Sequence, residues 1–88
     1  ITLCAGVTVA QEAYLCTASH DFSLPSHPLI VAPITIEDNA FIGARSFLLP
    51  GLIVGNHAIV GACSVVTRNV LPFQTVVGNP ARPTRPSA

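Results

Sequence analysis

The chain has 88 residues, of which half are apolar and 9% are charged, and its four arginines are balanced by four acidic residues. This length allows one small domain, and zero net charge argues against a basic nucleic-acid-binding surface. The apolar content excludes disorder, and no apolar stretch reaches the roughly 18 to 20 residues of a membrane span.

Residues 1–20 carry aliphatic side chains at six-residue intervals: Leu3, Val9 and Leu15. Small or aliphatic residues follow each of them four positions later. The chain does not begin with Met, so we expect it to be a piece of a longer protein with further coils upstream. Three cysteines without a C-x-x-C pair indicate reduced thiols, and therefore a cytoplasmic protein.

Residues 21–29 interrupt the six-residue count and contain Pro25 and Pro28. We therefore expect a loop that leaves the repeat over these residues. The count resumes in residues 30–71. Its aliphatic series is Ile30, Ile36, Ile42, Leu48, Val54, Val60 and Val66, again with small or aliphatic residues four positions later.

Glycine directly follows the aliphatic residue at Gly43, Gly55 and Gly61. We expect these glycines to serve turns with unusual backbone angles. Beyond residue 71, the segment 72–88 is rich in proline and is predicted to be an extended C-terminal arm.

A six-residue period predicts a short strand and a turn, repeated, with one aliphatic side chain pointing inward each time. Three such units make an 18-residue coil, and successive coils stack about 4.8 Å apart. The predicted fold class is all-β, a parallel β-helix. With 18 residues per coil, the two repeat segments make about 3.5 coils. Residues 18 apart, such as Ile42 and Val60, should form vertical columns.

Two stretches, residues 34–70 and 71–83, resemble the hexapeptide-repeat acyltransferases through VGNHAIVGACSVVT and GNPAR. Residues 13–21 (AYLCTASHD), followed by a loop and APITI, resemble the colanic-acid-type exopolysaccharide O-acetyltransferases and the maltose and galactoside acetyltransferase group. The resemblance implies a left-handed β-helix, a homotrimer, and transfer of acetyl from acetyl-CoA to a sugar or polysaccharide hydroxyl.

His20 stands where the chain leaves the repeat for the loop. A neutral imidazole can accept the proton of an attacking hydroxyl, and the resemblance implies that His20 is this general base. Asp21 could orient the imidazole, but neighbouring side chains on a strand point in opposite directions, so a backbone carbonyl is the expected partner. Asp21 and His27 are candidate acceptor-binding residues.

Three of the four arginines lie in the last 21 residues, and the guanidinium fork suits the phosphates of coenzyme A. The resemblance places the pantetheine arm beside small residues of adjacent coils and the nucleotide near the tail. The candidate cofactor-binding residues are Ala44, Ala62, Thr67, Arg68, Arg82 and Arg85.

Two other classes of function remain open. A non-catalytic trimeric β-helix would retain the fold alone. A zinc enzyme similar to γ-class carbonic anhydrases would need a histidine cluster, but His20 and His27 are seven residues apart and His57 lies in a turn predicted to be solvated. We therefore expect no metal.

Overall fold

A computed structural model describes residues 1–84, and these residues form short strands and no helix. No helix that could cross a membrane is therefore present among them. The strands are β1 (Thr2–Leu3), β2 (Thr8–Val9), β3 (Tyr14–Leu15), β4 (Ala18–His20), β5 (Leu29–Val31), β6 (Thr35–Ile36), β7 (Phe41–Ile42), β8 (Phe47–Leu48), β9 (Ile53–Val54), β10 (Ile59–Val60), β11 (Val65–Val66), β12 (Thr75–Gly78) and β13 (Ala81–Pro83).

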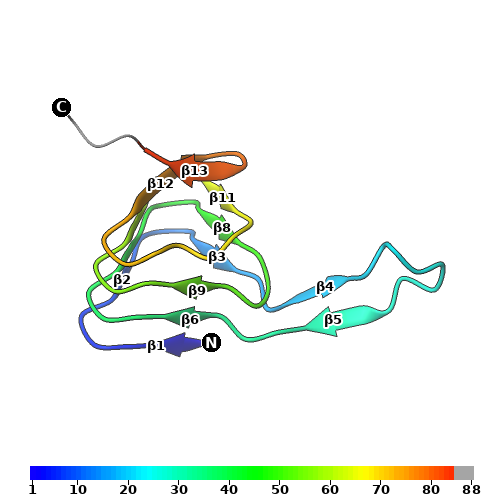
Figure 1. Cartoon of the computed structure of the whole chain (residues 1–88). Helices are drawn as coiled ribbons and strands as arrows, with labels where there is room; N and C mark the ends of the chain where they lie inside the picture. Colours follow the sequence, from blue (N-terminus) through cyan, green and yellow to red (C-terminus); the bar gives the residue numbers. More distant parts are fainter. Residues whose placement is uncertain (85–88) are drawn as a thin grey trace.

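The strands wind into a triangular coil whose turns stack on one another (Figure 1). One side of the triangle is built by β1, β6 and β9, the second by β2, β7, β10 and β12, and the third by β3, β8 and β11. All neighbours along these sides pair in parallel. The register joins Ile42 to Val60 and Leu48 to Val66, which confirms the predicted columns of residues 18 apart.

The interior is filled by the aliphatic series that the period predicts. From Ile36 to Val66 every residue of that series is at most 1% exposed, and the residues four positions later are buried as well. The first coil supplies the end of each column, where Leu3 pairs with Ile36 and Val9 pairs with Ile42. Because no described coil lies below them, Leu3 is 50% exposed and Val9 is 38% exposed. Burial therefore increases along the stack as each coil gains a neighbour on both sides.

Two serines occupy buried positions in this aliphatic interior, and both have hydrogen-bond partners. The Ser46 hydroxyl donates to the carbonyl of Gly43 at 2.7 Å and lies 3.1 Å from that of Gly61. The Ser64 hydroxyl accepts from the amide of Gly78 at 3.2 Å. Because a buried polar group is costly only when it lacks a partner, these serines fit the core without penalty.

The corners of the triangle are occupied by residues in the left-handed backbone conformation, which has a positive φ angle. Positive φ angles occur three residues after the inward aliphatic residue, at Gly6, Glu12, Asn39, Arg45, Gly51, His57, Cys63 and Phe73. The corner amides also join coils: His57 N–H donates to the Asp38 carbonyl, and Cys63 N–H to the Ala44 carbonyl. Most corners use a non-glycine residue, so composition alone does not mark them.

The prediction that Gly43, Gly55 and Gly61 serve turns with unusual backbone angles is wrong, because none of the three has a positive φ. They are needed for close approach instead. A Cβ at Gly43 would lie 2.6 Å from the backbone nitrogen of Ala62 in the next coil. Backbone packing between coils therefore selects glycine here.

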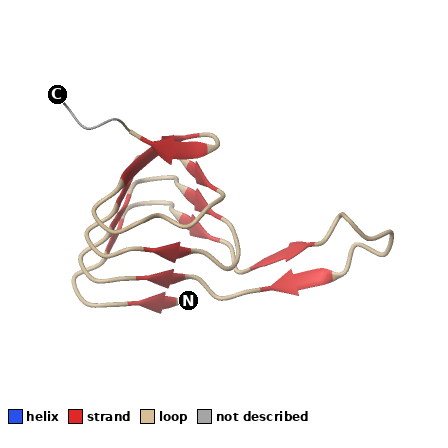
Figure 2. Ribbon diagram, viewed as in Figure 1, coloured by secondary structure: helices blue, strands red, loops and turns tan. Residues whose placement is uncertain are grey.

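The excursion from the coil is larger than the loop predicted at 21–29. Strands β4 and β5 pair in antiparallel register, Ser19 with Ile30 and His20 with Leu29, and form a hairpin that projects from the side of the stack (Figure 2). Residues 18–20 and 29–31 thus belong to the hairpin and not to the coils. Ile30, which fits the six-residue count, is accordingly 42% exposed.

The C-terminal segment is also more ordered than an extended arm. Strand β12 pairs in parallel with β10 and continues the second side of the triangle, and β13 folds back antiparallel onto β12. Val76 and Ala81 are consequently buried at the end of the core. A cis peptide bond joins Asn79 to Pro80 between the two strands.

Candidate active site

His20 ends strand β4, and its ring is tied to the backbone across the hairpin. Its Nδ1 lies 2.8 Å from the carbonyl oxygen of His27. A carbonyl oxygen can only accept, so Nδ1 carries the hydrogen in this bond. The neutral ring then has its lone pair on Nε2, and the imidazole side chain is exposed. A backbone carbonyl as the partner of His20 is therefore confirmed.

Asp21, next in sequence, makes its hydrogen bonds to Ser23. The hydroxyl and the backbone amide of Ser23 both donate to Asp21 Oδ1, the amide at 2.9 Å. The Ser23 hydroxyl, followed by the Ser23 amide, lowers the pKa of the Asp21 carboxyl below its usual value. This carboxylate stabilises the turn at the start of the loop.

His27 lies at the opposite end of the loop in a left-handed conformation, with φ of 44°. Its amide donates to the carbonyl of Leu24 at 3.0 Å. The Phe22 ring meets the His27 ring edge-on, with centroids 5.0 Å apart, and lies 6.2 Å from the His20 ring. The hairpin tip thus brings His20, Phe22 and His27 into one cluster.

Sequence reasoning missed Phe22 and Ser23 as parts of this arrangement. The signal that could have found Ser23 is the Asp-x-Ser pattern, because an Asp side chain commonly accepts from the amide two residues later. Phe22 gave no comparable signal. Its side chain is 72% exposed, and its neighbours are known only once the hairpin closes.

A pocket of about 310 Å³ lies at the C-terminal end of the stack and brings Arg68 and Arg82 together. Its apolar wall includes Val66, Val76 and Ala81, the last residues of the core. Arg82 Nη1 donates to the Ala81 carbonyl at 2.8 Å, and both residues line the pocket. Arg85 lies outside the described residues.

Ala44 and Ala62 lie in adjacent coils, as the 18-residue spacing predicts, since the amide of Cys63 donates to the Ala44 carbonyl at 2.8 Å. Ala62 is exposed and Ala44 is half-buried. Neither alanine lines the arginine pocket, and nor does the exposed Thr67. Four of the candidate cofactor-binding residues therefore form two groups: Ala44 and Ala62 lie in adjacent coils, and Arg68 and Arg82 line the pocket.

Arg45 does not line the arginine pocket and instead forms an ion pair with Glu12. Its Nε lies 2.7 Å from Glu12 Oε2 on the coil below, and both side chains are largely exposed. This contact joins the left-handed corner residues of two adjacent coils.

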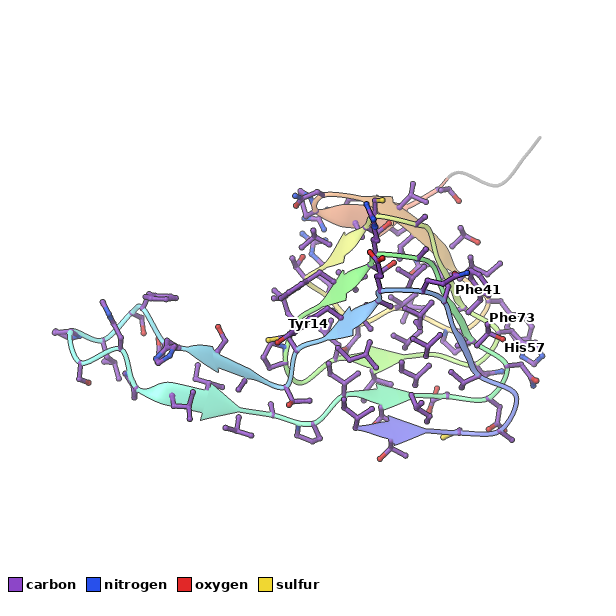
Figure 3. All side chains as sticks on the ribbon, turned by 180° about the vertical axis from the view of Figure 1, so that it is seen from behind. Tyr14, Phe41, His57 and Phe73 are labelled. Atoms are coloured by element: carbon purple, nitrogen blue, oxygen red, sulfur yellow. The ribbon has the colours of Figure 1, made fainter. Side chains whose placement is uncertain are left out.

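The three histidines are not brought together. His57 is exposed at a corner, as predicted, but its ring stacks on Phe73 with centroids 4.8 Å apart. In Figure 3, His57, Phe73 and Phe41 lie on the part of the stack away from the hairpin, whereas Tyr14 lies nearer its root. Residues 1–84 contain no group of three His, Cys, Asp or Glu side chains arranged to hold a metal ion.

Comparison with known proteins supports the family resemblance. Residues 33–68 match the family described as bacterial transferase hexapeptide (six repeats). A Schizosaccharomyces pombe protein named as an acetyltransferase is 38% identical over 97% of this chain and 42% of its own length. An Escherichia coli protein named as a colanic acid biosynthesis acetyltransferase is 37% identical over 92% of this chain and 44% of its own length.

Among solved structures, a hexapeptide-repeat-containing acetyltransferase of Vibrio cholerae, in complex with acetyl coenzyme A, is 36% identical with a TM-score of 0.76. The match covers 83% of this chain and 42% of that one. The chain thus spans less than half the length of these relatives. The predicted left-handed parallel β-helix is confirmed as the fold class, and residues 33–68 are similar to the hexapeptide-repeat transferase family.

Proposed function

We propose that the protein is an acetyl-CoA-dependent O-acetyltransferase that acts on a hydroxyl of a sugar or polysaccharide precursor, with His20 as general base. The observation that carries the proposal is the bond from His20 Nδ1 to the His27 carbonyl, because it places the hydrogen of the neutral ring on Nδ1 and lets Nε2 accept a proton. The names of the Escherichia coli and Vibrio cholerae relatives support the acyl donor and the class of acceptor.

Acetyl-CoA supplies an activated acetyl thioester. His20 Nε2 takes the proton of the acceptor hydroxyl as its oxygen attacks, and the same nitrogen returns a proton to the departing sulfur. During the interval in which the ring is cationic, the His27 carbonyl accepts from Nδ1–H and stabilises the positive charge. Asp21 holds the turn and takes no part in the proton transfer.

The arginine pocket fits the phosphorylated end of coenzyme A by its chemistry. Arg68 and Arg82 offer guanidinium donors for phosphate, and the apolar wall beside them suits an aromatic base. Ala44 and Ala62 would let the pantetheine arm approach the coil backbone. Thr67 and Arg85 complete the proposed cofactor-binding residues.

The assembly we propose is a cytoplasmic homotrimer with parallel helix axes. Outward positions on the sides of the triangle carry apolar residues that remain substantially exposed in the single chain, including Tyr14, Phe41, Ile53 and Ile59. Neighbouring copies would cover such residues and form the donor groove between them.

The test uses the full-length protein and an acetyl-transfer assay. His20→Ala should lower turnover by about 10² to 10⁴ and leave acetyl-CoA affinity nearly unchanged, since a general base contributes to that extent. The matched control is His57→Ala, which removes a histidine outside the proposed site. Near-normal turnover of His20→Ala would overturn the proposal, and failure of the wild type to bind acetyl-CoA would favour the non-catalytic β-helix.

A further inference from the structure

The His20 ring depends on a single carbonyl group whose direction is set by the backbone of His27. That residue has φ of 44°, in the left-handed region that non-glycine residues seldom enter. Pro28 follows it and disfavours the right-handed helical conformation at His27. The carbonyl oxygen reaches Nδ1 at 2.8 Å in this conformation.

Contacts on several sides hold His27 in this conformation. Its own amide donates to the Leu24 carbonyl at 3.0 Å, and the amide of Asp21 donates to the Pro28 carbonyl at 2.9 Å. The Phe22 ring packs edge-on against the His27 imidazole, at 62° between the ring planes. The strained residue is thus fixed from within the loop, from the backbone bond that closes the loop beside it, and from the adjacent aromatic ring.

We propose that His27 is a positioning residue for His20 that acts through its backbone carbonyl, and that Phe22 holds it in place. The inference rests on the proposed role of His20 as base. It gives the strained conformation a function: local strain of this kind persists where the surrounding contacts impose it, and it commonly serves a site. Aiming the carbonyl at Nδ1 keeps the proton there and the lone pair on Nε2.

The consequence of losing this bond is a change of tautomer. A neutral imidazole carries its proton on either nitrogen, and only the form with Nδ1–H can accept a proton at Nε2. Without the carbonyl, part of the population carries Nε2–H and cannot act as base. The loss should therefore appear in kcat, with little change in KM for the acceptor.

Two variants at the same position separate backbone from side chain. His27→Val introduces a β-branched residue that resists positive φ, whereas His27→Asn keeps a residue that tolerates it. We expect His27→Val to lower kcat of the full-length protein by about 10-fold or more, because the base is mispositioned in much of the population. His27→Asn should recover most of that loss. Equal rises in KM for both variants would assign His27 to acceptor binding through its side chain and overturn the inference.

The ¹⁵N chemical shifts of the His20 ring report the tautomer directly and do not require activity. The wild type and His27→Asn should show Nδ1–H, and His27→Val should show a mixture or Nε2–H. Phe22→Ala should shift the tautomer in the same direction by a smaller amount, which tests the ring contact without changing residue 27. An unchanged tautomer in both His27→Val and Phe22→Ala would overturn the inference.

The two proposals fail in distinguishable ways. If the tautomer follows residue 27 but His20→Ala keeps its turnover, His27 positions a ring that is not the base, and the proposed function fails. If His20→Ala is inactive while His27→Val keeps both kcat and the Nδ1–H tautomer, the function stands and the positioning role is wrong. A melting temperature close to wild type shows that the coil stack is intact, as expected for a hairpin that projects from it.

Discussion

Leu48 pairs in register with Val66, 18 residues later, and both side chains are at most 1% exposed. Leu48 also pairs with Leu15 of the first coil, so it contacts a neighbour on each side in its column. Shortening this side chain leaves a cavity that stacked coils cannot close without losing their hydrogen bonds.

Leu48→Ala should therefore destabilise the protein by about 2 to 5 kcal/mol, the range for a buried leucine. Leu24→Ala is the matched control, because Leu24 is 50% exposed in the hairpin loop. It should change the free energy of unfolding by less than about 0.5 kcal/mol. Chemical denaturation of the two variants checks the difference, and equal losses would contradict the column as the source of stability.

Gly61→Ala should destabilise the protein, and a second substitution should repair it. A Cβ at Gly61 would collide with a methyl group of Val77 in the next coil, and we expect a cost of about 1 to 3 kcal/mol. Val77→Ala removes that methyl, so the double variant should regain most of the loss. Gly43→Ala is the contrasting case, because its Cβ meets backbone atoms of residues 60 and 62. The same Val77→Ala change should not rescue it; thermal unfolding distinguishes the pairs.

Arg82→Ala should weaken the binding of coenzyme A more than the binding of dephospho-CoA if this side chain contacts the 3′-phosphate. A charge-assisted contact contributes about 1.5 to 3 kcal/mol, which corresponds to about a 10- to 100-fold loss of affinity. Arg45→Ala removes the same charge from a residue paired with Glu12 outside the pocket, and it should have little effect. Calorimetry with both ligands measures the difference. Equal loss for both would mean that Arg82 does not contact the 3′-phosphate.

The proposed trimer predicts that a charge on an outward apolar position disrupts assembly and leaves the coil intact. Phe41 is 41% exposed on the side built by β2, β7, β10 and β12, so Phe41→Glu would place a carboxylate where a neighbour should pack. We expect a smaller species in sedimentation with an unchanged far-ultraviolet spectrum. A wild-type protein that is monomeric at micromolar concentration would contradict the trimer.

Ser23→Ala should raise the pKa of the Asp21 carboxyl toward its usual value, because the Ser23 hydroxyl is the main cause of the lowered pKa. A carboxyl whose pKa is lower in the folded state stabilises that state above its unfolded pKa. The contribution disappears as the pH falls through the folded pKa. In acid, the turn at Asp21 should therefore loosen. Nuclear magnetic resonance titration of the Asp21 carboxyl in wild type and Ser23→Ala measures the shift; identical curves would contradict the role of the hydroxyl.

The sequence by itself determined the repeating part of this protein. The coils follow the same local rule, an inward aliphatic residue and a small or aliphatic residue four positions later, and similar coils stack without further instruction from the sequence. Ile36, Ile42, Leu48 and their successors are buried for this reason, and the 18-residue columns follow from the period. His20 was identifiable as a candidate because the family resemblance places the general base at the histidine that precedes the loop.

Only the tertiary structure decided how far the hairpin extends into the repeat and which residues come into contact there. Ile30 fits the period, yet it lies in the hairpin because antiparallel pairing with Ser19 competes with the parallel ladder over these residues. A backbone carbonyl was the expected partner of His20, but only the closed hairpin shows that it belongs to His27. Arg68 and Arg82 meet because β13 folds back over the end of the core. Such contacts join non-repeating segments, so their positions depend on long-range pairing that a local period does not encode.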